Sequence, residues 1–198
     1  MTADTMTTIL FITSYILIIL LFYLEHRYES LRTTTTLQLS GDDRGTTRLL
    51  FIMSILSLVI IAPLSTFLFN SSSDSSSNSV AMSWIGFVFM LISIILLRWT
   101  TFVNPFYLRT MATTDDHFIC TDGPYRMIRH PGYLAFLLAW IGFGLLTIHW
   151  ISFIIISLIM TYAYLRRIQA EEQMMLDRFG VDYQHYMNES YRLLPFVY

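Results

Sequence analysis

The sequence predicts an all-α, polytopic integral membrane protein with about five transmembrane helices, the last two of which form a helical hairpin. Three observations support this fold class. First, 55% of the 198 residues are apolar and the mean hydropathy is +0.55, which is too apolar for a soluble domain. Second, the apolar residues are concentrated in long runs. Third, the basic residues gather on one side of those runs.

The apolar runs cover residues 9–24, 49–69, 80–97, 134–148 and 151–165. About 20 apolar residues cross a bilayer, so the first three runs are long enough. The last two reach spanning length when Pro131, a favourable first helical residue, and Arg166 and Arg167, which extend to the interface, are included. Pro63 is expected to kink the second run near its outer end.

The arginines predict the orientation. All twelve basic residues are arginines, at positions 27, 32, 44, 48, 98, 109, 126, 129, 166, 167, 178 and 192, and every one falls on the same side of the predicted spans. The positive-inside rule makes that side cytoplasmic, with the N-terminus outside and the C-terminus inside. No basic residue precedes the first run and no small-residue cleavage pattern follows it, so we expect no signal peptide.

Composition also limits the chemistry. The serine-rich segment 70–79 is a flexible connector to which we assign no chemistry. A single cysteine, Cys120, and lone histidines without paired spacing predict no metal site. We expect a division into N-terminal helices (1–97) and a core (98–198). Charged residues crowd the inner segments 98–131 and 166–198, so any chemistry is expected at the cytoplasmic face. The membrane is an expected partner, and nucleic acid is not.

Helical geometry brings the two inner segments together. The predicted turn of the hairpin is His149-Trp150, and His130, Arg167 and Glu171 all lie about 18 to 22 residues from it, so their depths agree within roughly 3 Å. We therefore predict that these three residues face one another in a pocket at the cytoplasmic surface. Glu171 and Glu172 point about 100° apart on a helix, so at most one of them is expected to face this pocket.

Individual residues predict the local structure of both segments. Gly123-Pro124 indicates a turn, and Pro131 opens a helix whose free N–H groups, with His130, favour an anion. Alternatively, Arg126, Arg129 and His130 anchor the span to lipid headgroups, and Arg167 with Glu171 forms a solvated i,i+4 pair. The last helix is expected to end at Gly180. Residues 181–198 predict an amphipathic lid, in which His185 and the tyrosines serve packing.

The stretch "HFICTDGPYRMIRHPGY", then the hairpin, then "RIQAEEQMMLDRFGVDYQHYMNESYRLLP" resembles the isoprenylcysteine carboxyl methyltransferase family, which is related to phospholipid methyltransferases. The resemblance covers about residues 98–198. It implies transfer of a methyl group from S-adenosylmethionine to the terminal carboxylate of a prenylated cysteine, with S-adenosylhomocysteine as product. Such a displacement requires no general base, because a carboxylate is already ionised near neutral pH.

The resemblance also implies the site residues. Arg167 matches the substrate-binding arginine, and Arg167 with Glu171 are the expected catalytic residues. One departure is visible: Ala135 stands where the family often has glycine, which could narrow the cofactor's seat. The residues implied to bind the cofactor are His117, Phe118, Ile119, Cys120, Tyr125, His130, Pro131, Gly132, Tyr133 and Glu171.

Three other functions stay open. A phospholipid N-methyltransferase would need a proton acceptor, for which Glu172 or a tyrosine is the nearby candidate. A membrane sterol-type reductase, which uses NADPH, resembles the same half of the chain, but the Glu171-Glu172 pair and the short chain favour methyl transfer. A scaffold or transporter gives no reason for the convergence of charges, and a transport pathway would require ionisable residues in mid-span.

Overall fold

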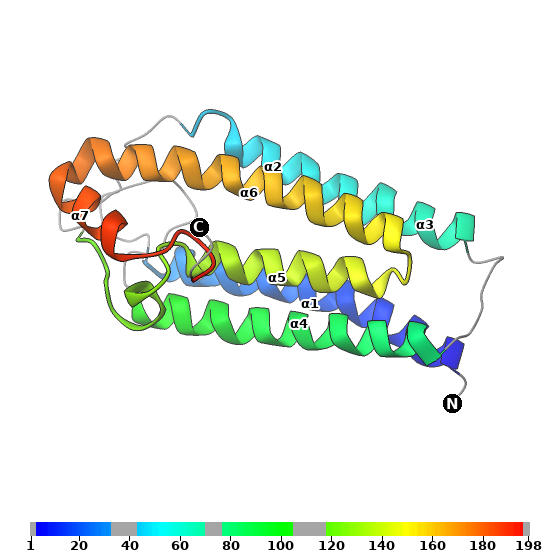
Figure 1. Ribbon diagram of the computed structural model, residues 1–198. Helices are drawn as coiled ribbons and strands as arrows, with labels where there is room; N and C mark the ends of the chain where they lie inside the picture. Colours follow the sequence, from blue (N-terminus) through cyan, green and yellow to red (C-terminus); the bar gives the residue numbers. More distant parts are fainter. Residues whose placement is uncertain (1–2, 33–42, 70–76, 105–117, 196–198) are drawn as a thin grey trace.

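The protein is described by a computed structural model over residues 3–32, 43–69, 77–104 and 118–195. Its long helices lie side by side and alternate in direction (Figure 1). The helices are α1 (Ala3–Arg32), α2 (Thr46–Ile55), the π-helical segment η1 (Leu56–Ile61), α3 (Ala62–Phe69), α4 (Ser77–Val103), the 3₁₀ turn η3 (Gly123–Arg126), α5 (Pro131–Leu146), α6 (Trp150–Phe179) and α7 (Val181–Glu189).

The predicted helical membrane fold is confirmed. Among the residues that the structure describes, four segments are long and apolar enough to cross a bilayer, namely Thr5–Ser30, Thr46–Ser65, Ser79–Val103 and Trp150–Phe179. The fourth predicted span is α5, an apolar helix of 16 residues that begins at Pro131 as predicted. It packs against α4, α6 and α1, and most of its side chains are buried. Helix α5, although shorter than these four segments, is thus the centre of the bundle.

The second predicted span contains an irregular segment close to Pro63. Helix α2 continues directly into the π-helical segment η1, and α3 follows without a break. Proline has no N–H to donate to the preceding turn, so the helix must adjust its hydrogen bonding there. The structure thus has a wider helical turn over residues 56–61, directly before Pro63.

Helices α4 and α5 approach each other most closely at a pair of glycines. A Cβ atom on Gly142 would lie 2.5 Å from the carbonyl oxygen of Gly86, and a Cβ on Gly86 would lie 2.6 Å from that of Gly142. No larger residue fits at either position without moving a backbone. Small residues at such a crossing allow membrane helices to pack closely.

The predicted hairpin of α5 and α6 is confirmed, but its turn is longer than predicted. It runs from Thr147 to His149, where the Thr147 hydroxyl donates to the Gly144 carbonyl at 2.7 Å, and Ile148 has a positive φ of 64°. At its far end, α6 stops at Gly180, as predicted, with a φ of 53°.

The arginines of the described residues lie near one end of the bundle. At this end α1, α4 and α6 finish while α2 and α5 begin, and the N-terminus lies at the opposite end (Figure 1). Since charged groups gather there and long apolar helices separate the two ends, the molecule has the polarity of an integral membrane protein.

Candidate functional site at the arginine-rich end

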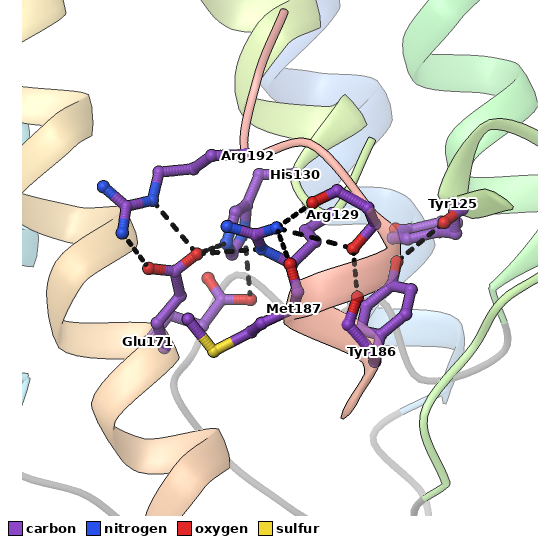
Figure 2. Close-up of polar contacts among 9 residues, drawn as sticks. Tyr125, Arg129, His130, Glu171, Tyr186, Met187 and Arg192 are labelled. Atoms are coloured by element: carbon purple, nitrogen blue, oxygen red, sulfur yellow. Dashed lines mark hydrogen bonds and ion pairs between the residues drawn. The ribbon is translucent and has the colours of Figure 1, made fainter. Parts of the chain in front are cut away.

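Glu172, on α6, is the centre of a buried charge cluster. Its Oε1 accepts from Arg129 Nε at 3.1 Å and its Oε2 accepts from Arg192 Nη2 at 2.7 Å. The Nε2 atom of His130 lies 3.3 Å from Oε1. Only 6% of the Glu172 side chain is exposed. Figure 2 shows Arg129, His130 and Arg192 pointing toward the carboxylates of α6. We call these four residues the Glu172 cluster.

The prediction that at most one of the paired glutamates faces the pocket was wrong. His130 lies between them, with Nδ1 3.9 Å from Glu171 Oε1 and Nε2 3.3 Å from Glu172 Oε1. The 100° between the two Cβ directions is compensated by the length of the side chains and by the imidazole, whose two nitrogens point in different directions. Glu172 is buried, whereas 29% of the Glu171 side chain stays exposed.

The segment after α7 is joined to the start of α5 through backbone hydrogen bonds. The N–H of Arg129 donates to the Tyr191 carbonyl at 2.7 Å, and the N–H of Tyr191 donates to the Met127 carbonyl at 2.8 Å. The Arg129 guanidinium also donates to the carbonyls of Met187 and Ser190. The described part of this segment is therefore a fixed wall of the site rather than the predicted surface lid.

These contacts separate the alternatives for the arginines before α5. Arg129, with 8% of its side chain exposed, is held by Glu172 and is not a headgroup anchor. Arg126 is exposed and keeps that possible role. His130 is 5% exposed and also belongs to the site. The sequence did not predict Arg192 as a site residue or Glu172 as the partner of Arg129, because the burial of Arg129, which requires a nearby anion, follows only from the packing of the bundle.

Tyr133 connects the Glu172 cluster to Arg167. Its hydroxyl lies 2.5 Å from Glu171 Oε2 and 3.3 Å from Arg167 Nε. Its ring stacks on His130, with the ring centroids 5.7 Å apart. The predicted convergence of His130, Arg167 and Glu171 is therefore present, although Arg167 and Glu171 meet through the hydroxyl of Tyr133.

Arg167 reaches from α6 toward the start of α2. Its Nη1 donates to the hydroxyls of Thr46 and Thr47, both at 2.9 Å, and lies 3.8 Å from Asp43 Oδ2. Its side chain is 2% exposed. The Thr47 hydroxyl and the Gly45 N–H lower the pKa of Asp43, so this carboxylate stays ionised beside the guanidinium. The first half of the chain thus positions Arg167, which no sequence motif indicated.

A cavity lies between α1, α2, α5 and α6. It is small and partly open to the surroundings, and its lining consists of Phe22, Glu25, Thr47, Leu50, Ser54, Tyr133, Phe136, Tyr164 and Arg167. We call it the Arg167 cavity. Arg167 and Tyr133 face it from the hairpin, so it adjoins the Glu172 cluster on the other side of Tyr133.

The other predicted site residues surround this centre. Tyr125 is buried; its carbonyl accepts from the Tyr186 hydroxyl at 2.7 Å, and burial raises its phenol pKa well above the usual value, with a smaller contribution from Glu171. Cys120 is buried and its thiol pKa is raised by that burial. Pro131 and Gly132 are buried at the start of α5.

Three further positions complete the set. Phe118 is 54% exposed and Ile119 is half-buried, whereas His117 lies outside the described residues. Ala135 is fully buried in the core, as expected of a helix-contact position. Within the described ranges, histidine, cysteine and acidic residues form no group of three that could hold a metal ion.

The fold and this site define a polytopic helical membrane protein with a charged pocket built on its last hairpin. The sequence model of the isoprenylcysteine carboxyl methyltransferase family matches residues 84–177. The resemblance found in the sequence is therefore confirmed over this segment, which includes α5, most of α6 and most of the predicted pocket.

Individual relatives each match less than half of the chain. A probable protein-S-isoprenylcysteine O-methyltransferase of Oryza sativa subsp. indica is 32% identical over 83 residues, which is 42% of this chain and 44% of that protein. The protein-S-isoprenylcysteine O-methyltransferase of Schizosaccharomyces pombe is 30% identical over 82 residues, 41% of this chain and 35% of the yeast protein. The matched segment thus spans less than half the length of these curated relatives.

The fold also matches a solved structure. That structure is described as a eukaryotic intramembrane Ras methyltransferase, an isoprenylcysteine carboxyl methyltransferase; the TM-score is 0.55 at 22% sequence identity, over 74% of this chain and 52% of the other. This similarity covers a larger share of the chain than each sequence comparison does, and it supports the helical membrane architecture over that share.

Proposed function

We propose that the protein is an integral membrane methyltransferase that transfers the methyl group of S-adenosylmethionine to the carboxylate of an isoprenylated cysteine. The observation that carries this proposal is the position of Tyr133, which contacts both Glu171 and Arg167. An acid and a histidine lie on one side of this tyrosine and a buried arginine on the other. Such an arrangement suits two ligands of different charge that meet at one point.

The side that binds the methyl donor consists of the exposed face of the Glu172 cluster and the residues next to it. S-adenosylmethionine supplies an electrophilic methyl group when bound. Glu171, which keeps 29% of its side chain exposed, offers a carboxylate to an amino group. His130 and the free N–H groups at the start of α5 suit a ligand carboxylate. Residues 117–120, Tyr125 and 131–133 are the proposed remaining contacts.

The acceptor side is the Arg167 cavity. A guanidinium binds a carboxylate through two parallel hydrogen bonds, and the burial of Arg167 strengthens that contact. Phe22, Leu50 and Phe136 provide apolar walls for the part of the acceptor next to its carboxylate. Because a carboxylate is ionised near neutral pH, the protein needs only to align the reactants and exclude water, which supplies several kcal/mol.

The structure favours a carboxylate over an amine as the acceptor. Amine methylation requires a residue that takes a proton. Glu172 is already bound by Arg129, Arg192 and His130, and burial raises the phenol pKa of Tyr125, Tyr183 and Tyr186. The predicted proton acceptor was Glu172 or a tyrosine; the Glu172 carboxylate is held by these cations and the three phenols stay protonated near neutral pH, so none of them is available to take a proton.

The orientation is part of the proposal. The arginine-rich end of the bundle faces the cytoplasm under the positive-inside rule. A hydrophilic donor would then enter from the cytosol, while a prenyl chain would approach from the bilayer.

The first test is calorimetric titration of the detergent-purified protein with S-adenosylhomocysteine, with NADPH as the parallel ligand. We expect saturable binding of S-adenosylhomocysteine alone, weakened at least tenfold by Glu171→Ala. Glu189→Ala removes an acid whose side chain is 69% exposed and is the matched control, for which no change is expected. Binding of NADPH alone would identify a reductase and reject the proposal.

The second test offers the protein radiolabelled S-adenosylmethionine with either N-acetyl-S-farnesylcysteine or phosphatidylethanolamine. We expect label in a base-labile methyl ester of the first acceptor. Label that enters only the phospholipid, in a base-stable form, would replace this proposal with N-methylation.

A further inference from the structure

The Arg167 cavity contains a second charged residue that neither the sequence motifs nor the family match includes. Glu25, on α1, lines it opposite the hairpin and is 3% exposed, while Arg167 is 2% exposed. The family match begins only at residue 84. An ionisable side chain within an apolar membrane helix is costly, and such residues usually mark a functional site. Glu25 therefore requires an explanation that the hairpin alone does not give.

The two charges define the ligand that the cavity can complement. Arg167 offers only donors and an ionised glutamate offers only acceptors. A matching ligand carries both an anionic group and an N–H donor. Its remainder must be apolar, because Phe22, Leu50 and Phe136 line the same space. The cavity is narrow, so it suits the polar end of an acceptor rather than a whole lipid chain.

We propose that Glu25 is a specificity-determining residue of the acceptor site, where it accepts a hydrogen bond from the nitrogen of the cysteine whose carboxylate binds Arg167. This inference rests on the proposed function. In an S-prenylated cysteine the nitrogen and the carboxylate are attached to the same carbon. The N–H belongs to an amide when the cysteine ends a peptide and to an ammonium when the amino acid is free.

Three acceptors that differ only at this nitrogen test the inference. N-acetyl-S-farnesylcysteine has an amide N–H, S-farnesylcysteine has an ammonium, and S-farnesylthiopropionate has no nitrogen; all keep the thioether and the carboxylate. We expect kcat/KM of the unaltered protein to be about tenfold or more higher for at least one nitrogen-bearing acceptor than for the thiopropionate. The better of the two nitrogen-bearing acceptors identifies the source of the N–H.

Two substitutions of Glu25 test whether its carboxylate causes the preference for a nitrogen-bearing acceptor. Glu25→Ala should remove the preference, leaving the three acceptors within about twofold of one another. Glu25→Gln keeps an acceptor oxygen but no charge, so it should retain a preference for the amide and lose one for the ammonium. Glu29→Gln, one turn further along α1 and outside the cavity lining, is the matched control and should keep the full preference. Binding of S-adenosylhomocysteine verifies that each variant is folded.

The outcomes separate this inference from the proposed function. If the unaltered protein methylates the thiopropionate as fast as the other two acceptors, or if the folded Glu25→Ala protein keeps the full preference, Glu25 is not a specificity residue although methyl transfer stands. If S-adenosylhomocysteine does not bind and none of the three acceptors is methylated, the proposed function itself fails.

Discussion

Tyr133 is the residue at which the two sides of the site meet. Its hydroxyl contacts Glu171 at 2.5 Å and Arg167 at 3.3 Å, and its ring stacks on His130. Each of these three neighbours has a proposed role in binding the methyl donor or the acceptor. A change at this hydroxyl should therefore affect the alignment of donor and acceptor more than the binding of either one alone.

We predict that Tyr133→Phe lowers kcat by about tenfold or more, because the hydroxyl that orients Glu171 and Arg167 is lost while the ring still packs. The dissociation constant of S-adenosylhomocysteine should change by less than about threefold. Tyr162→Phe, at a tyrosine that is 53% exposed on α6, is the control. Unchanged turnover in Tyr133→Phe would show that the hydroxyl does not align the reactants.

Glu172 acts mainly on stability. Three cationic or potentially cationic side chains share its carboxylate, and the loss of one member of a buried ion pair leaves the others uncompensated. We predict that Glu172→Gln lowers the free energy of unfolding by about 3 kcal/mol, visible as a lower melting temperature in detergent. Glu189→Gln, at an exposed acid, should leave the melting temperature unchanged, and equal melting of both variants would contradict a structural role.

At the scale of the elements, the crossing of α4 and α5 determines how closely α5, which carries part of the site, packs against the N-terminal helices. The crossing depends on Gly86 and Gly142, where backbone meets backbone. Tyr133 lies on the same helix α5 as Gly142, so a wider crossing would also move the site.

We predict that Gly142→Ala destabilises the protein by about 1 to 3 kcal/mol, because the added methyl meets the Gly86 carbonyl oxygen rather than a flexible side chain. Gly144→Ala is the matched control on the same helix; its Cβ would lie 3.2 Å from the Phe153 Cα, so a smaller loss is expected. Thermal unfolding of the two variants in one detergent measures the difference. An equal loss would mean that the crossing is not the limiting contact.

Sequence reasoning succeeded with elements whose signal is local. Apolar runs, Pro131 and Gly180 predicted the long helices, the start of α5 and the end of α6. Helical arithmetic also predicted that His130 and Glu171 meet, since a short turn fixes the register of two antiparallel helices. The turn itself was misplaced because Thr147 and Ile148 continue the apolar pattern while the backbone already leaves the helix.

The contacts that sequence reasoning missed join distant parts of the chain. Arg192 reaches Glu172, Arg167 reaches Thr46 and Thr47, and Glu25 lines the Arg167 cavity. None of these pairs has a fixed spacing or a repeating pattern. Their proximity follows from the packing of the bundle, which a single sequence does not specify at the level of side chains.

At the scale of the whole molecule, the arginine-rich end and the N-terminal end of the bundle should lie on opposite sides of the membrane. We predict that, in sealed inside-out vesicles, protease removes a tag placed after residue 198 and spares a tag placed before residue 1. Permeabilised vesicles, in which both tags should be cleaved, provide the control. The reverse pattern in sealed vesicles would place the site on the outer side.

The backbone pairing of Tyr191 with Met127 and Arg129 has a consequence for biogenesis. The transmembrane helices can insert one after another during translation, but the Glu172 cluster lacks one of its two arginines until residue 192 has left the ribosome. Helix insertion and maturation of the site are therefore separate events. A chain arrested between α7 and Tyr191 would reside in the bilayer with its helices in place and its pocket unfinished.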